Sequence, residues 1–306
     1  MIEVYKRLSY DDPLRKLSTF DKNSWINIVD PTEKELNSLI KKFRLDRENV
    51  MNALDVNETP RIEYNGGNLY VFMRVPISSD NPTTSSFLTI ITTNNFITIS
   101  KVELSIFKNF IKSSKGILTN ENSRNLIKLL YLVSRTFGFS VRRIFKEVIE
   151  NKKNIQDLSN KDILKLVLKE DILNDYNFSF KPMIDIYTNL IKTNKFRFKE
   201  TDKELIEDLI IDMNQTSEMT NLSLKTISNM RSYYSTTVSN KLNDTITLLT
   251  ILTVFLNVPL IITGIYGMNI ALPLQNNYHV ISILLSIVVV VWIVLFIFFK
   301  IKKVIN

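Results

Sequence analysis

The sequence contains no cysteine and a single histidine, His279. Without cysteine there is neither a disulfide framework nor a thiolate metal site. One imidazole cannot build a histidine-rich zinc site, and its place near the C-terminus excludes Ser-His or Cys-His catalysis in the long preceding part of the chain. We also find no phosphate-binding loop, cluster of metal ligands or nucleophile–base pair. We therefore expect a protein that is not an enzyme and has no resident cofactor.

Charge is absent from one long stretch. Residues 245–299 make 55 consecutive positions without Asp, Glu, Lys or Arg, whereas the preceding part of the 306-residue chain carries charge at ordinary density. Within this stretch, residues 245–266 and 280–299 are long enough to cross a hydrocarbon core of about 30 Å. The sequence therefore predicts two membrane-spanning helices, joined by a loop over residues 267–279.

The basic residues around the spans predict an orientation. Lys300, Lys302 and Lys303 lie in the tail 300–306, and the loop 267–279 has no Lys or Arg. The positive-inside rule then places the loop outside and the tail in the cytoplasm. With two spans, the large N-terminal part is cytoplasmic as well. We expect a multi-pass protein of the cell membrane, with no cleaved export signal.

The net charge of +8 indicates a basic surface facing an anionic bilayer. A nucleic-acid partner is not expected, because finger spacing and RNA-binding signatures are missing. Residues 1–200 predict a cytoplasmic domain that mixes strands and helices (α/β or α+β), with a helical second half from about residue 104. Thr32 and Glu35 have the spacing of a capping box at the start of a helix. The predicted strands are 25–29, 69–75, 87–92 and 96–100.

Residues 201–244 are compatible with a helix but rich in Ser, Thr and Asn. Such a composition does not make a stable lone helix, so its neighbours must hold it. From residue 201 to 266 the only glycine is Gly264 and the only proline is Pro259. A continuous helix over this range would run on the order of 95 Å at about 1.5 Å per residue. We predict a stalk helix, 201–244, that continues into the first span.

The first span has a polar stripe, whereas the second span is almost uniformly apolar. At about 100° per residue the stripe falls within an arc of about 120°, and Pro259 lies on the far side. Polar groups inside a bilayer usually face protein or water. The stripe could serve hydrogen bonding between helices, or it could line a pore built from several copies of the chain. The stripe residues are Asn243, Thr247, Thr250, Thr253, Asn257 and Gly264.

The turn after the first span reads Gly264-Ile265-Tyr266-Gly267-Met268-Asn269. Asn269 would lie at the outer end of the span, where amide and carbonyl oxygens can hydrogen-bond the water shell of a cation. Mg²⁺ suits such a site, because it gives up its water reluctantly. A carboxylate ring would bind the ion tightly and slow its exit.

A Gly-Met-Asn motif at the end of the first of two C-terminal spans resembles the signature of the CorA family of magnesium transporters. Residues 238–244 are similar to that family's stretch leading into the pore helix. The resemblance implies a funnel-shaped homopentamer with a pore lined by the first span. It also implies a selectivity filter at Gly267, Met268 and Asn269. The pore-lining positions would be Asn243, Thr250, Asn257 and Gly264.

Two further assignments come from the resemblance alone. Ile246 and Leu249 fall where the family has its hydrophobic gate. Asp208 aligns with a stalk carboxylate that helps to bind regulatory Mg²⁺ between subunits, with Asp80 as a guessed partner. The chain departs from the family because its loop lacks the acidic residue that many members carry after the motif, and because Pro259 lies one residue late.

We therefore expect a channel that moves hydrated Mg²⁺ and closes when cytoplasmic Mg²⁺ is high. One alternative is transport of Zn²⁺, Co²⁺ or Ni²⁺ by the same architecture, although the intact motif argues against the proton-coupled zinc branch. Another is a membrane-anchored sensor that conducts nothing. Such a sensor would not need Thr and Asn along one face of a span.

Overall fold

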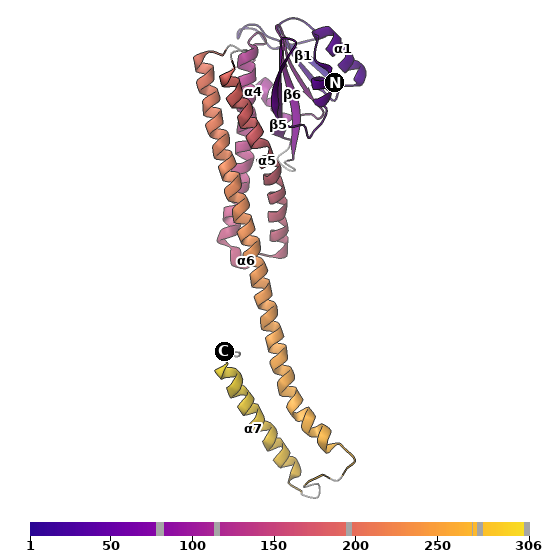
Figure 1. The fold of residues 1–306 in the computed structure, drawn as a ribbon, viewed down its shortest axis with the longest axis vertical. Coiled ribbons are helices and arrows are strands. Elements are labelled where there is room, and N and C mark those ends of the chain that lie inside the picture. Colours follow the sequence, from indigo (N-terminus) through magenta and orange to yellow (C-terminus); the bar gives the residue numbers. More distant parts are fainter. Residues whose placement is uncertain (78–82, 113–116, 194–197, 271, 274–277, 303–306) are drawn as a thin grey trace. The chain divides into compact units, whose positions relative to one another are not determined.

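The computed structural model describes residues 1–77, 83–112, 117–193, 198–270, 272–273 and 278–302. The chain divides into two compact units, Met1–Arg231 and Ser232–Asn306. Figure 1 shows the sheet and helices of the first unit, and the C-terminal part of α6 together with α7 in the second. The sequence predicted a domain that mixes strands and helices, then long helices, then two apolar C-terminal helices, and the structure confirms this order. Asp80 lies outside the described residues.

A seven-stranded sheet forms the start of the first unit, in the order β2-β1-β3-β7-β6-β5-β4. β3 and β7 pair in parallel, and the other neighbours are antiparallel. The predicted hairpin is present, although β6 begins earlier than the sequence indicated. The strands are β1 Ile2–Lys6, β2 Arg15–Leu17, β3 Trp25–Val29, β4 Arg61–Asn65, β5 Asn68–Pro76, β6 Thr84–Ile91 and β7 Phe96–Ser100.

Helices cover both faces of the sheet, which is why β3, β5, β6 and β7 are buried along their whole length. Neighbouring side chains of a strand point to opposite faces, so Trp25 joins one hydrophobic cluster and Ile26 the other. Leu36 and Leu39 of α1 (Glu33–Phe43) and Val50 of α2 (Arg47–Asn52) belong to the second cluster. The first cluster includes residues of α3 (Ser105–Lys112) and of the helices that follow.

The predicted capping box starts α1. The Thr32 backbone N–H donates to Glu35 Oε2 at 2.7 Å, and the Glu35 N–H donates to Thr32 Oγ1 at 3.4 Å. The Thr32 hydroxyl also donates to Glu35 Oε2, at 2.9 Å. The hydrogen bonds from the Thr32 backbone N–H and hydroxyl stabilise the charged form of the carboxylate and so lower the pKa of Glu35. The turn between β4 and β5 requires glycine, because Gly66 and Gly67 have φ values of +60° and +79°.

The helical part of the first unit consists of α4 (Asn122–Lys153), the short 3₁₀ turn Ile155–Asp157, α5 (Asn160–Lys192) and the start of α6 (Glu200–Tyr266). α4 and α5 pack through Phe137 and Tyr176, whose ring centroids are 5.2 Å apart. Ile206, Met213 and Ile227 of α6 are buried in the same cluster.

The Ser- and Thr-rich composition of α6 is compatible with a buried face. Four of its hydroxyl residues are buried, and each donates a hydrogen bond of 2.8–2.9 Å to the carbonyl four residues earlier. Each donor is therefore satisfied inside its own helix, and no partner from another element is needed. These residues are Thr216, Thr220, Ser223 and Thr226.

One polar cluster ties α5 to the sheet. Arg74 of β5 is only 4% exposed, and its Nη2 lies 3.4 Å from Asp175 Oδ1 of α5. Asp175 also accepts hydrogen bonds from Thr84 of β6, at 2.7 Å from the backbone N–H and 2.9 Å from the hydroxyl. A buried guanidinium needs such an acceptor, because an unpaired buried charge is costly.

We expect Asp175→Ala to lower the free energy of unfolding by about 2 kcal/mol, because it leaves the buried Arg74 without its carboxylate. The measurement is urea unfolding of the detergent-solubilised full chain. Asp171→Ala, an exposed position on the same helix, serves as the control and should change the value by less than about 0.5 kcal/mol. Equal effects of the two substitutions would contradict the role assigned to Asp175.

The second unit contains the C-terminal part of α6 and α7 (Val280–Ile301). Both helices are long and apolar enough to cross a membrane, with mean hydropathies of 2.3 and 3.3 over their most apolar windows. Most large apolar side chains of this unit are exposed in the single chain. A surface of this kind is typical of a protein surrounded by lipid or by further copies.

Candidate functional site

α7 packs against one face of the C-terminal part of α6. The Trp292 indole N–H donates to the carbonyl of Phe255 at 2.8 Å, and the two ring centroids are 6.2 Å apart. A groove between the helices is lined on the α6 side by Pro259, Ile262, Thr263 and Tyr266. The α7 side contributes Val280, Ile281, Leu284, Leu285 and Val288.

The polar stripe lies on the opposite face of α6. Asn257 is two residues from both Phe255 and Pro259, so it points about 160° away from each at about 100° per residue. Asn243, Thr250, Thr253, Asn257 and Gly264 are all exposed. Because α7 does not cover the stripe, contact between the two spans of one chain does not explain it.

The threonines of the stripe present oxygen acceptors. Thr250 Oγ1 donates to the Ile246 carbonyl and Thr253 Oγ1 to the Leu249 carbonyl, both at 2.8 Å. A hydroxyl has one proton and two lone pairs. Since the proton is used within the helix, the lone pairs remain for a donor from outside. A hydrated cation is such a donor, because its water molecules point their hydrogens outward.

Two large apolar residues interrupt the polar stripe near the end that the positive-inside rule places toward the cytoplasm. Ile246 and Leu249 are 51% and 63% exposed in the single chain. Ile246 lies within the arc of the stripe, and Leu249 lies about 40° beyond its edge. A narrow apolar band between Asn243 and Thr250 would result wherever several copies of this face meet.

The turn at the end of α6 is tightly wound. The Gly267 N–H donates to the Thr263 carbonyl at 2.9 Å, and the Met268 N–H donates to the Ile265 carbonyl at 3.2 Å. A Cβ atom on Gly267 would lie 3.1 Å from the Thr263 oxygen. A residue with a side chain would therefore push the turn away from the helix end. Around Gly264, by contrast, a Cβ atom would meet nothing within 4 Å in the single chain.

Asn269 follows this turn and is exposed together with Met268. Within the described part of the chain its side-chain amide has no hydrogen-bond partner. The sequence did not predict a nearby contact. The Tyr266 hydroxyl donates a hydrogen bond to the Pro273 carbonyl at 3.1 Å and so ties the loop to the helix end. A tyrosine at the last helical position before a proline-containing loop was the available signal.

Asp208 belongs to the first unit and is exposed on α6. Among the described residues, no group of three or more His, Cys, Asp or Glu side chains could hold a metal ion. One chain therefore brings no second ligand set to Asp208 within the ranges that the structure covers. Its role stays a prediction, as do the roles of the filter and gate residues.

Comparison with known proteins relates the chain to one family and several solved structures. Residues 20–303 match the family described as CorA-like Mg²⁺ transporter protein. The cobalt/magnesium transport protein CorA of Methanocaldococcus jannaschii is 25% identical over 284 residues, covering 89% of each chain.

Three solved structures show the same fold. The complete structure of the CorA magnesium transporter from M. jannaschii has a TM-score of 0.83 at 23% identity, covering 98% of this chain and 97% of that one. The full-length CmaX protein has a TM-score of 0.77 at 17% identity, covering 96% of both. The ZntB cytoplasmic domain from Vibrio parahaemolyticus has a TM-score of 0.64 at 11% identity, covering 78% of this chain and 98% of that domain.

The absence of native cysteine allows a direct test of which face of α6 meets water. A single cysteine in place of Asn257 should react with a water-soluble thiol reagent at least about tenfold faster than one in place of Ile262. The reason is that the reactive thiolate forms in water and is disfavoured against apolar neighbours. The measurement is the rate of labelling in intact membranes. Equal rates at the two positions would contradict a water-facing stripe.

Proposed function

The chain belongs to the CorA family of Mg²⁺ transporters, and from this premise we propose that it forms a channel that carries hydrated Mg²⁺ across the cell membrane. The observation that carries the proposal is the position of the polar stripe on the face of α6 opposite α7. One copy of that face cannot enclose a pore. Several copies can, with α6 inside and α7 outside, and the family resemblance favours a funnel-shaped homopentamer.

The chemistry of the stripe favours a cation that keeps its water. Mg²⁺ prefers an octahedral oxygen shell and dehydrates reluctantly, so it is best conducted with its waters in place. Thr250, Thr253 and Asn257 offer neutral oxygen acceptors to those waters, and residues 245–299 contain no carboxylate that would hold the ion. Conduction needs binding that is weak enough for the ion to leave.

The turn at the end of α6 would form the selectivity filter. One Asn269 amide from each copy would make a ring of oxygen atoms at the outer mouth, next to Met268. Gly267 allows that ring to start directly at the helix end, because no Cβ atom pushes against the Thr263 carbonyl. Ile246 and Leu249 would close the pore as a hydrophobic gate, and Asn243 would lie at its cytoplasmic end.

Regulation by cytoplasmic Mg²⁺ is part of the proposal. Asp208 carries an exposed carboxylate without an ion-pair partner among the described residues of its own chain. A carboxylate from the neighbouring copy would complete a site for Mg²⁺ between subunits. Loss of the ion would let like charges repel and would loosen the closed ring.

The proposed topology follows from the charges near the spans. Residues 245–266 and 280–299 lie inside α6 and α7. Lys300 and Lys302 follow the second span, which favours a cytoplasmic C-terminus and therefore a cytoplasmic N-terminal unit.

Co²⁺ is a second candidate cargo. The relative from M. jannaschii is described as a cobalt/magnesium transport protein. Both ions are divalent and are bound by oxygen donors in water. A neutral filter that binds the hydration shell would accept them both.

We expect Asn269→Ala to leave the protein folded and to lower Mg²⁺ uptake into liposomes at least tenfold, because the ring of amide oxygens at the mouth is lost. The measurement is uptake by purified protein, with thermal melting as the check on folding. Ile270→Ala, the next exposed position of the same turn, is the matched control and should keep most of the uptake. Undiminished uptake by the Asn269→Ala protein would contradict the role of the filter.

A further inference from the structure

Pro259 interrupts the hydrogen bonding of α6 in the part that crosses the membrane. It lies inside the helix, and proline has no backbone N–H. In an α-helix the N–H of a residue donates to the carbonyl four positions earlier. The carbonyl that loses its donor to Pro259 is therefore that of Phe255.

The structure supplies a different donor to that carbonyl. The Trp292 indole N–H of α7 lies 2.8 Å from the Phe255 oxygen. Indole nitrogen is a donor only, so the bond has one possible direction. The Trp292 ring also lies beside the Phe255 ring, with centroids 6.2 Å apart and planes tilted by 44°.

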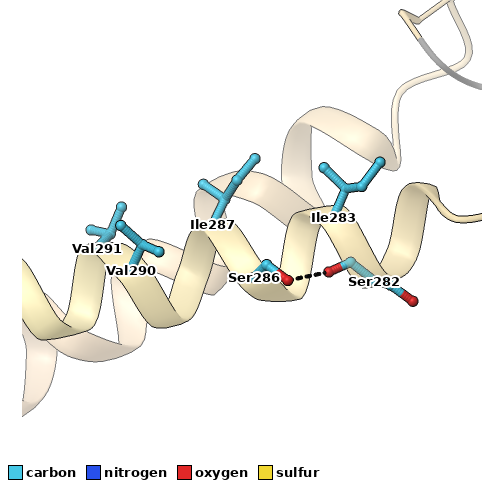
Figure 2. Close-up of a pocket in the computed structure, with 6 residues that line it drawn as sticks. All are labelled: Ser282, Ile283, Ser286, Ile287, Val290 and Val291. Atoms are coloured by element: carbon cyan, nitrogen blue, oxygen red, sulfur yellow. Dashed lines mark hydrogen bonds between the residues drawn. The ribbon is translucent and has the colours of Figure 1, made fainter.

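The environment makes this bond costly to lose. A bilayer core holds no water for an unpaired backbone carbonyl, and each unsatisfied group there is expensive. The other side-chain hydrogen bond described within α7 stays inside that helix. Figure 2 shows the Ser286 hydroxyl donating to the Ser282 carbonyl, at 2.8 Å, beside a groove lined by Ile283, Ile287, Val290 and Val291.

We propose that Trp292 is a positioning residue of the pore helix. Its indole N–H takes the place of the backbone N–H that Pro259 lacks, and this single directional bond fixes the height and rotation of α7 on α6. Because Phe255 and Asn257 point about 160° apart, holding α7 at the Phe255 carbonyl keeps the polar stripe facing away from α7. The consequence for transport rests on the proposed function, whereas the bond itself does not.

A double-mutant cycle tests the coupling between the two residues. Trp292→Phe keeps an aromatic ring and removes the donor, and Pro259→Ala restores a backbone N–H to the Phe255 carbonyl. We expect Trp292→Phe alone to lower the melting temperature of the purified protein by about 3 °C. When Pro259→Ala is already present, the loss should be less than a third as large, because the carbonyl no longer depends on Trp292. Equal losses in the two backgrounds would overturn the proposal.

Ser286→Ala is the matched control. It also removes one hydrogen-bond donor from α7, but that donor serves α7 itself. Its effect on the melting temperature should be the same with and without the Pro259→Ala substitution. A coupling as large as that of Trp292 would show that Pro259→Ala alters α7 in general, and it would overturn the specific role of the indole.

Transport measured per folded protein gives a readout that a loss of stability alone would not change. Trp292→Phe should lower the maximum rate of Mg²⁺ uptake severalfold and leave the half-saturating Mg²⁺ concentration unchanged, because the Asn269 mouth is intact. In the protein that already carries Pro259→Ala, the same substitution should not slow uptake further. A shift in half-saturation with an unchanged maximum rate would contradict positioning of the pore helix.

A spectroscopic measurement covers the case in which Trp292→Phe does not fold. The chain has two tryptophans, Trp25 and Trp292, so ¹⁵N-labelled indole gives two signals. Spin-labelled lipid should broaden the signal of Trp292 and spare that of the buried Trp25. A hydrogen-bonded chemical shift for Trp292 in the unaltered protein supports the proposal, and the shift of a free indole overturns it. If the unaltered protein moves no Mg²⁺, the proposed function fails. The melting temperatures and the indole chemical shift would still show whether the hydrogen bond between Trp292 and Phe255 is present.

Discussion

The exclusion of water from the bilayer core is the constraint on which the second unit depends. A backbone group there must find its partner inside the protein, and a charged side chain has no solvent to stabilise it. The charge-free residues 245–266 and 280–299 answer both demands by forming helices. Pro259 removes one backbone donor from α6, and Trp292 of α7 provides the replacement.

The same constraint divides α6 into two faces with different tasks. The face with Phe255 and Pro259 receives α7, and the face with Asn257 offers neutral oxygen atoms. Threonine suits a polar face inside a membrane because its hydroxyl proton is hydrogen-bonded within the helix, while its oxygen remains an acceptor for an outside donor. In the first unit the same bonding pattern lets Thr216 and Thr220 be buried without outside partners. The hydrogen bond from a hydroxyl to the carbonyl four residues earlier thus lets α6 carry threonines both in the core of the first unit and in the apolar second unit.

Local and periodic features could be predicted from the sequence. The capping box of Thr32 and Glu35, the hairpin of β6 and β7 and the two apolar helices depend on residues close in the chain, and the structure confirms them. Contacts between distant residues could not be predicted. Three such contacts join residues that lie 37 to 101 positions apart in the chain. They are the parallel pairing of β3 with β7, the Arg74–Asp175 pair and the Trp292–Phe255 bond. No periodicity reports such pairings, so the acceptor of the Trp292 indole could not be predicted.

The central claim, that several copies of the stripe conduct hydrated Mg²⁺, is tested most directly by the purified protein in liposomes free of other proteins. Mg²⁺ uptake should rise when the interior is made electrically negative, should be unchanged by an imposed pH gradient and should be slowed by competing Co²⁺. Uptake that requires a proton gradient, or a membrane potential that drives no Mg²⁺ at all, would contradict the account.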